Sequence, residues 1–268
     1  MKNLRKYIAE YLLIFSVVAL SVAGFWNIYL GVDVSPTWYQ TAHLITILIW
    51  LFLLLFQLSL IARSEYDTHR KIGLSILFFG PLLFAATALL SVYSAHKGLI
   101  SVKGDALLVQ NVMGTLELGL VILLAFVFRK RRALHGAFIL SSAILFMGIA
   151  IFFTLLGWAP QFKIEGPETF YRFGMAAGVA QLVVFPVGLL FFIKDWRNGW
   201  PYLLVSLTFT FNHFINVLLE NNNLIPAVTE FVGTLNPLVT FLGSFVFLFV
   251  LLTLTGIRPS RPLTKLGQ

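Results

Sequence analysis

Long apolar segments, joined by short loops that hold most of the basic residues, constrain this chain more than any other feature. A helix needs about 20 apolar residues to cross the hydrocarbon core of a bilayer. Eight segments reach that length, near residues 9–30, 37–62, 73–95, 107–128, 134–158, 171–193, 200–219 and 229–255. The sequence therefore predicts an all-α polytopic membrane bundle, with residues 1–268 forming a single integral membrane domain.

The composition agrees with a membrane protein and excludes an ordinary soluble domain. Hydrophobic residues make up 59% of the 268 residues, and charged residues make up 11%. Soluble domains carry roughly 25% charged residues. Because eight spans and their loops account for almost the whole length, no room is left for a separate soluble domain.

The basic residues are distributed unequally between the two sides of the predicted bundle. Fifteen of the 19 Lys and Arg residues fall on one side. They are Lys2, Arg5, Lys6, Arg63, Arg70, Lys71, Arg129, Lys130, Arg131, Arg132, Lys194, Arg197, Arg258, Arg261 and Lys265. The other side has Lys97, Lys103, Lys163 and Arg172. Since basic loops remain in the cytoplasm, both termini are expected there. The net charge of +8 then reflects orientation in a lipid bilayer and does not indicate nucleic-acid binding.

Several kinds of chemistry are excluded by the residues that are absent. The chain has no cysteine, so it contains no disulfide, thiolate metal site or catalytic thiol. It also lacks a glycine-rich phosphate loop, an HExxH zinc motif and a GxSxG nucleophile motif. Histidine is the remaining side chain suited to binding a haem or a metal ion.

The five histidines fall at distinct predicted depths. His43 and His213 lie toward the outer side of their spans, whereas His69 and His135 follow basic turns on the inner side. Two axial ligands of one haem must come from different helices at similar depth. The sequence therefore predicts two candidate haem b sites, His69 with His135 and His43 with His213. His96 is expected to lie among the headgroups.

Each histidine also has a structural interpretation. At the end of a span, an imidazole can bond to headgroups, water or an adjacent loop. His213 lies deeper, about 10 Å from the outer end at 1.5 Å per residue, where polar side chains normally face the bundle interior. Its alternative role is a hydrogen bond between two helices.

Glu117 is the most costly residue in the predicted spans. It lies near the middle of its segment, in GTLELGL, where a carboxylate costs about 3 kcal/mol on insertion scales. It is therefore expected to be protonated, paired, or beside a water-filled cavity, with His213 as a candidate partner. Its functional interpretation is a proton relay or a cation site, and its structural interpretation is a neutral carboxyl group bonded to a neighbouring helix.

Two further patterns concern helix faces. Asn212, His213, Asn216 and Glu220 recur at roughly helical spacing, so this side is expected to line the bundle interior or an outward vestibule. Gly174 and Gly178 form a small-xxx-small pair, which predicts close packing against another helix.

The residues around three of the histidines resemble a known family. AHLITILIWLFLLLFQ, THRKIG and LHGAFILSSAIL resemble a bacterial group of uncharacterised membrane proteins that is compared with cytochrome b561-like proteins. The resemblance covers about residues 37–155 and matches His43, His69, Arg70, Gly73 and His135. It implies a multi-pass protein of the bacterial inner membrane that binds b-type haem. The chain departs from cytochrome b561 in its number of spans and in where its histidines lie within them.

Three functions remain open at this stage. The first is transmembrane electron transfer through haem b, with a quinol or soluble donor and Glu117 as a proton group. The second is a small transporter, or a subunit of a membrane complex, in which the histidines are structural. The third is a haem-modifying enzyme resembling haem A synthase, whose Glu-containing motifs are not evident in this chain.

Overall fold

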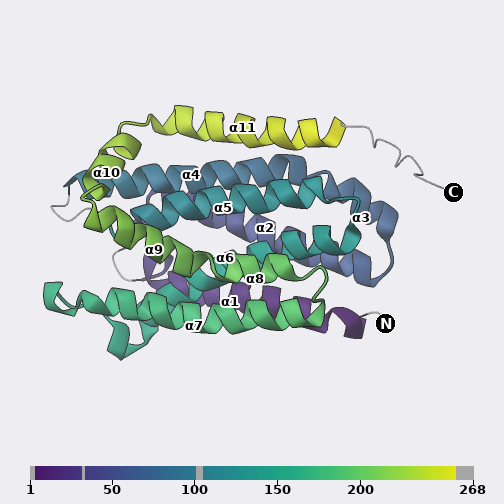
Figure 1. Ribbon diagram of the computed structural model, residues 1–268, viewed down its shortest axis with the longest axis horizontal. Coiled ribbons are helices and arrows are strands. Elements are labelled where there is room, and N and C mark those ends of the chain that lie inside the picture. The colour runs from purple at the N-terminus through teal and green to yellow at the C-terminus, as the bar shows by residue number, and fades with distance from the viewer. Residues whose placement is uncertain (1–3, 32–33, 101–104, 258–268) are drawn as a thin grey trace.

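The described residues of the computed structural model, 4–31, 34–100 and 105–257, form a bundle in which every regular element is a helix (Figure 1). The α-helices are α1 (Ile8–Tyr29), α2 (Trp38–Ala62), α3 (Tyr66–Gly73), α4 (Ile76–Ile100), α5 (Leu108–Val127), α6 (Arg132–Trp158), α7 (Tyr171–Lys194), α8 (Trp200–Ser206), α9 (Thr208–Asn221), α10 (Ile225–Gly233) and α11 (Pro237–Ile257). There are also three short 3₁₀ helices among the described residues: η1 (Leu4–Tyr7), η2 (Pro160–Phe162) and η3 (Pro167–Thr169).

Eight segments of the described chain are long and apolar enough to cross a membrane, which confirms the predicted polytopic bundle. Six of them are formed by α1, α2, α4, α5, α6 and α7, α1 being extended by η1 and α7 by η3. The seventh combines α8 with α9, and the eighth is α11. The protein is thus a multi-pass membrane protein.

The last predicted span, near 229–255, is wrong at its start. Residues Ile225–Gly233 form the separate helix α10, and the span begins only at Pro237. Asn236 explains the boundary, because its Oδ1 accepts hydrogen bonds from the backbone N–H groups of Leu238 (3.0 Å) and Val239 (3.2 Å). Asn at this position satisfies N–H groups that the first turn leaves free. Pro237 therefore opens the helix, where proline costs no hydrogen bond.

One other span is interrupted, and the segment before the third span forms a helix of its own. The segment holding His69 is a separate short helix, α3, and α4 begins only at Ile76. The seventh span breaks at Leu207, between α8 and α9. At this break, Gln181 Nε2 on α7 donates to the carbonyl oxygen of Ser206 at 2.8 Å. A neighbouring helix thus satisfies a backbone group at the interruption, as membrane burial requires.

Helices α4 and α6 form the centre of the bundle. Helix α6 packs against α1, α5, α7 and α8, while α4 packs against α2, α5, α10 and α11. A Cβ added to Gly24 of α1 would lie 2.6 Å from the carbonyl oxygen of Ala150, so these two backbones approach closely. Between α2 and α6, Trp50 Nε1 donates to the buried Oγ of Ser142 at 2.9 Å. Small residues and one buried polar bond therefore hold the centre together.

The prediction for Gly174 and Gly178 is wrong. A Cβ added at either position would meet no atom within 4 Å. Close packing occurs at other glycines: a Cβ on Gly188 would lie 2.4 Å from Ser206 Cβ, and one on Gly148 would lie 2.3 Å from Phe209. Both contacts fix the segment around the break between α8 and α9.

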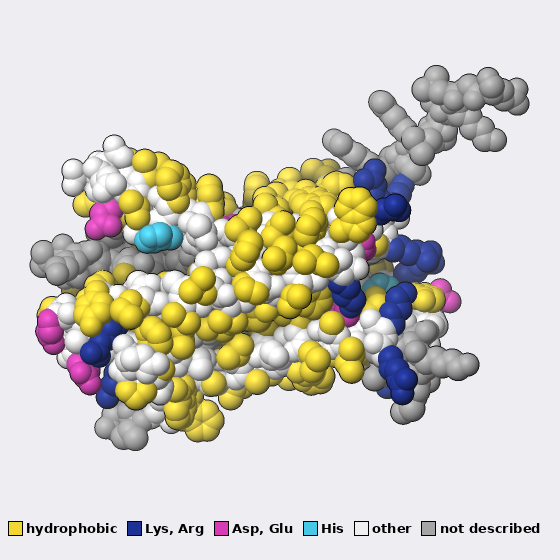
Figure 2. Space-filling model, turned by 60° about the horizontal axis from the view of Figure 1, so that its bottom comes forward, with side chains coloured by type: hydrophobic (Ala, Val, Ile, Leu, Met, Phe, Trp, Pro, Cys, Tyr) yellow, Lys and Arg dark blue, Asp and Glu magenta, His cyan; other side chains and the backbone are white. Residues whose placement is uncertain are grey.

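Most charged residues lie at the two ends of the bundle, with apolar side chains between them (Figure 2). We call one end the basic end, because eleven of the fourteen described Lys and Arg residues belong to the segments that meet there. The opposite end carries Lys97, Lys163 and Arg172. The start of α1 and the end of α11 both lie at the basic end (Figure 1), as an even number of spans requires. Lys2, Lys103, Arg258, Arg261 and Lys265 lie outside the described residues.

Candidate functional site

A cavity of about 260 Å³ lies inside the bundle, in its half away from the basic end. Its walls come from α1, α2, α4, α5, α6 and α9. The lining residues at the opposite end include Gln40 at the start of α2 and Lys97 near the end of α4. Its deepest lining residues include Glu117 in the middle of α5 and Phe209 beside the helix break. The cavity therefore extends from one end of the bundle to about its middle.

Glu117 is held at the cavity by an amide on α9. Asn212 Nδ2 donates to Glu117 Oε2 at 3.4 Å and to Gln110 Oε1 at 3.3 Å. Asn212 is buried, with 2% of its surface exposed. Thr208 also lies beside the carboxyl group, but its hydroxyl donates to the carbonyl oxygen of Val205. The other carboxyl oxygen, Oε1, is buried and has no hydrogen-bond partner among the described residues.

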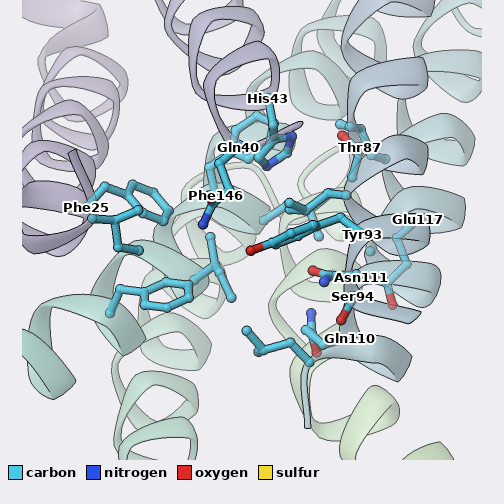
Figure 3. Close-up of a pocket in the computed structure, with 18 of the residues that line it drawn as sticks. Phe25, Gln40, His43, Thr87, Tyr93, Ser94, Gln110, Asn111, Glu117 and Phe146 are labelled. Carbon is cyan, nitrogen blue, oxygen red and sulfur yellow. The ribbon is translucent and has the colours of Figure 1, made fainter. Parts of the chain in front are cut away.

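The cavity has one aromatic wall and one polar wall (Figure 3). Phe25 and Phe146 lie on one side, and Asn111, Ser94 and Glu117 lie on the other. Phe153 of α6 and Phe209 of α9 add to the apolar lining. Such a combination of apolar lining with a few polar groups is typical of small-molecule sites.

His43, which belongs to the second span, lines the upper part of this cavity in the view of Figure 3. Its Nδ1 is buried without a hydrogen-bond partner among the described residues. His43 lies near the start of α2, toward the end of the bundle opposite the basic end. The structure adds that His43 lines the same cavity as Glu117, which the sequence did not predict.

Near the opposite end, the cavity is bordered by a paired cation. Lys97 Nζ lies 2.7 Å from Asp105 Oδ2 and 5.2 Å from the centre of the Tyr93 ring. Gln40 Oε1 accepts hydrogen bonds from the backbone N–H and the hydroxyl of Thr37 at the start of α2. The charge on Lys97 is therefore already matched by a carboxylate of the protein.

His213 does not belong to this site. Its side chain is exposed on the outside of α9 and does not line the cavity, whereas its neighbour Asn212 is buried and bonded to Glu117. The predicted pairing of Glu117 with His213 is wrong, because the two successive residues point to different sides of the helix. His43 and His213 are likewise not brought together, so this predicted haem pair has no geometric basis.

The second histidine pair lies near the basic end, outside the cavity. Gln57 of α2, with its amide nitrogen facing α3, donates to the carbonyl oxygen of His69 (3.1 Å) and to its Nδ1. The Gln57 oxygen accepts from the backbone N–H of Gly73 at 3.2 Å. Burial lowers the pKa of His69 below its ordinary 6.5, and the nearby His135 and Arg70 lower it further. His69 and His135 are therefore close neighbours.

Hydrogen bonds determine which ring nitrogens of this pair could bind iron. His135 Nδ1 lies 2.8 Å from the carbonyl oxygen of Ala125, so it carries the proton and leaves Nε2 available. His69 accepts at Nδ1 from Gln57, which places the proton of the neutral ring on Nε2. Only His135 is therefore arranged as an axial ligand, and the two residues do not fit a bis-histidine haem as they stand.

His96 has a structural contact that its predicted headgroup position did not suggest. Its Nε2 lies 3.0 Å from the carbonyl oxygen of Gly233, which joins α4 to α10. A Cβ on Gly233 would lie 2.6 Å from Leu99, so the two helices touch at this point. His96 therefore helps to hold α10 against the bundle.

Most of the polar wall was not predicted from the sequence. Gln110, Gly114 and Glu117 are spaced by four and three residues, and Asn111 and Leu118 follow the same face of α5. This spacing places their side chains on one side of a helix. The pattern was available in the sequence, but Ser94 of α4, which completes the wall, is brought to it only by folding.

These features define a multi-pass membrane protein with a mainly apolar internal cavity that carries a few polar groups and ends at a partly buried carboxyl group. Within the described residues, no group of three or more His, Asp or Glu side chains could hold a metal ion. No protein-family model matches the chain, and neither does any curated protein or solved structure in the comparisons.

Proposed function

We propose that this protein is a transporter of small organic solutes in the bacterial inner membrane, with the cavity around Glu117 as its binding site. The observation that carries the proposal is that the cavity reaches the middle of the bundle and ends at a carboxyl group. A volume of about 260 Å³ is slightly below the ~300–1,000 Å³ of sites for drug-sized ligands. The expected substrate is therefore a smaller molecule.

The interrupted seventh span supports the same function. Transporters commonly place substrate near the membrane midplane, beside helices that are discontinuous at that depth. The break at Leu207 lies directly before Thr208 and Phe209, which contact Glu117 and the cavity respectively. Movement at this break would therefore change the deepest part of the site.

The absence of cysteine permits a direct test of access to the cavity. Gly114→Cys places a thiol on the cavity wall, and Leu116→Cys places one on the same helix but facing outward, where Leu116 is 57% exposed. We expect a membrane-impermeant cationic thiosulfonate to modify the first variant and to spare the second. Reaction of the lipid-facing thiol would be slow, because hydrocarbon excludes the charged reagent.

Transport requires access from both sides of the membrane in turn. Gly114→Cys should therefore react both in intact cells and in inside-out vesicles. The basic end, which is expected to face the cytoplasm, defines which side of the protein the reagent meets in each preparation. A structural subunit would give reaction from one side only, or none. Either of these outcomes would contradict transport.

A b-type haem held by His69 and His135, with a quinol as electron donor, is the competing proposal. Its support is the closeness of the two rings and the available Nε2 of His135. It requires Gln57 to release Nδ1 of His69 so that the proton can move from Nε2. We expect protein made with ample haem to show no Soret or alpha band in a reduced-minus-oxidised spectrum. Bands that disappear together in His69→Ala and His135→Ala would favour the haem instead.

A further inference from the structure

We infer that the solute is a small organic cation: a protonated amine attached to an apolar, preferably aromatic, body. This inference rests on the proposed function and concerns the same cavity. It joins three observations, which are the charge of the lining, the unsatisfied acceptor of Glu117 at its deep end and the aromatic wall opposite.

Charge is the first argument. Among the described lining residues, Glu117 is the sole carboxyl group and Lys97 the sole Lys or Arg. Lys97 is already paired with Asp105 at 2.7 Å. No described Lys or Arg of the lining therefore remains to neutralise Glu117, and His43 is the one other basic side chain there. A ligand that brings one positive charge would complete the pair within a site of low dielectric constant, where such an interaction is strongest.

Unsatisfied hydrogen-bond acceptors are the second argument. Glu117 Oε1, a lining atom, is buried without a partner among the described residues. The same is true of Oδ1 of Asn212, which bonds to Glu117 but is not itself a lining residue. Asn212 Nδ2 already donates to Glu117 and Gln110, which fixes Oδ1 as an acceptor that faces no donor. Buried acceptors normally find a donor. An ammonium group carries three N–H donors and no acceptor, so it complements this end of the cavity.

Shape is the third argument. Phe25 and Phe146 face the polar wall across the cavity, and the Tyr93 ring lies between the two sides (Figure 3). Aromatic faces attract cations and also pack well against flat apolar groups. A molecule with an amine at one end and a single ring at the other would match both walls.

The test compares three probes of almost equal size with the unmodified protein in detergent. These are 2-phenylethylamine, which is cationic, 2-phenylethanol, which is neutral, and 3-phenylpropionate, which is anionic. We expect calorimetric titration to give binding of the amine that is at least about tenfold tighter than binding of the alcohol, with weaker binding still for the acid. Equal binding of amine and alcohol would overturn the inference.

Glu117→Gln tests the residue itself. This variant should weaken binding of the amine by about tenfold or more and leave binding of the alcohol nearly unchanged. Glu220→Gln is the matched control, since Glu220 is exposed near the end of α9 and does not line the cavity. Unchanged amine binding by a folded Glu117→Gln variant would also overturn the inference, and if that variant fails to fold, the three-probe comparison still decides.

Failure of the two proposals can be told apart. If Gly114→Cys reacts with the thiosulfonate from both sides but the amine does not bind, the amine specificity is wrong and the transport proposal stands. If Gly114→Cys reacts from neither side, both proposals fail, because the cavity is then not accessible to solutes.

Discussion

Asn212 on α9 donates its side-chain amide to Glu117 on α5, across the middle of the bundle, at 3.4 Å. The same nitrogen also bonds to Gln110, about two turns of helix away from Glu117 on α5. This bridge places the one carboxyl group of the cavity lining and fixes α9 against α5. The stability of the bundle and the proposed solute binding therefore depend on the same buried amide.

Asn212→Ala should destabilise the protein. The change leaves Gln110 Oε1 and Glu117 Oε2 without the Asn212 donor, and a buried polar group without its partner costs about 1–3 kcal/mol. The expected result is a lower thermal unfolding temperature in detergent. His213→Ala is the matched control, because the neighbouring side chain is exposed and should have little effect. Equal decreases in the unfolding temperature of both variants would argue against a stabilising bridge.

Gly188→Ala should also be destabilising, through overpacking. The added Cβ would lie 2.4 Å from Ser206 Cβ and 2.7 Å from the Tyr202 carbonyl oxygen. Forcing an extra methyl group into such a contact costs about 1–3 kcal/mol. Gly178→Ala, on the same helix, meets nothing within 4 Å and should be neutral or slightly stabilising. Thermal unfolding of the two variants side by side checks this, and an equally stable Gly188→Ala would show that α7 and α8 can separate without cost.

Trp50→Phe should weaken the contact between α2 and α6. It removes the 2.9 Å bond from Trp50 Nε1 to Ser142 Oγ within a site where Trp50 is only 1% exposed. A buried hydrogen bond contributes about 1 kcal/mol net, and the smaller ring adds a packing loss. Trp26→Phe provides the control, since Trp26 is 42% exposed. Only Trp50→Phe should lower the unfolding temperature.

Stability should fall as pH decreases below about 6.5, and His69 should contribute to that fall. Burial, His135 and Arg70 lower the pKa of His69 in the folded protein from its ordinary 6.5. Below pH 6.5 the unfolded chain therefore binds a proton at this residue before the folded protein does, so protonation favours unfolding. The contribution of His69 is fully present above that pH and is lost progressively below it.

The measurement is the unfolding temperature of the wild type and of His69→Asn over this pH range. The variant should show a shallower decrease as pH falls, because it lacks the titrating ring. Identical slopes for wild type and His69→Asn would remove His69 as a source of the pH dependence.

The eight spans and the common end of the termini were predictable because they depend on local properties. Length, apolar content and the position of basic loops are all read along the chain, and they gave the correct number of spans. One predicted boundary failed, at Asn236–Pro237, and the break inside the seventh span at Leu207 was not predicted. At the first, a capping side chain starts the helix late, and at the second, Gln181 from another helix satisfies a backbone carbonyl at the break.

The identity of the residues that line the site depends on which face each helix turns toward its neighbours. The sequence identified Glu117 as a residue that must be paired or hydrated, and it placed His43 near the outer part of its span. It did not show that Asn212 faces inward while His213 faces outward, because one residue along a helix turns the side chain by about 100°. Periodicity fixes relative directions on one helix, but the direction that meets protein is set by packing. Only the tertiary structure therefore decided that Glu117 and His43 share a cavity and that His213 lies outside it.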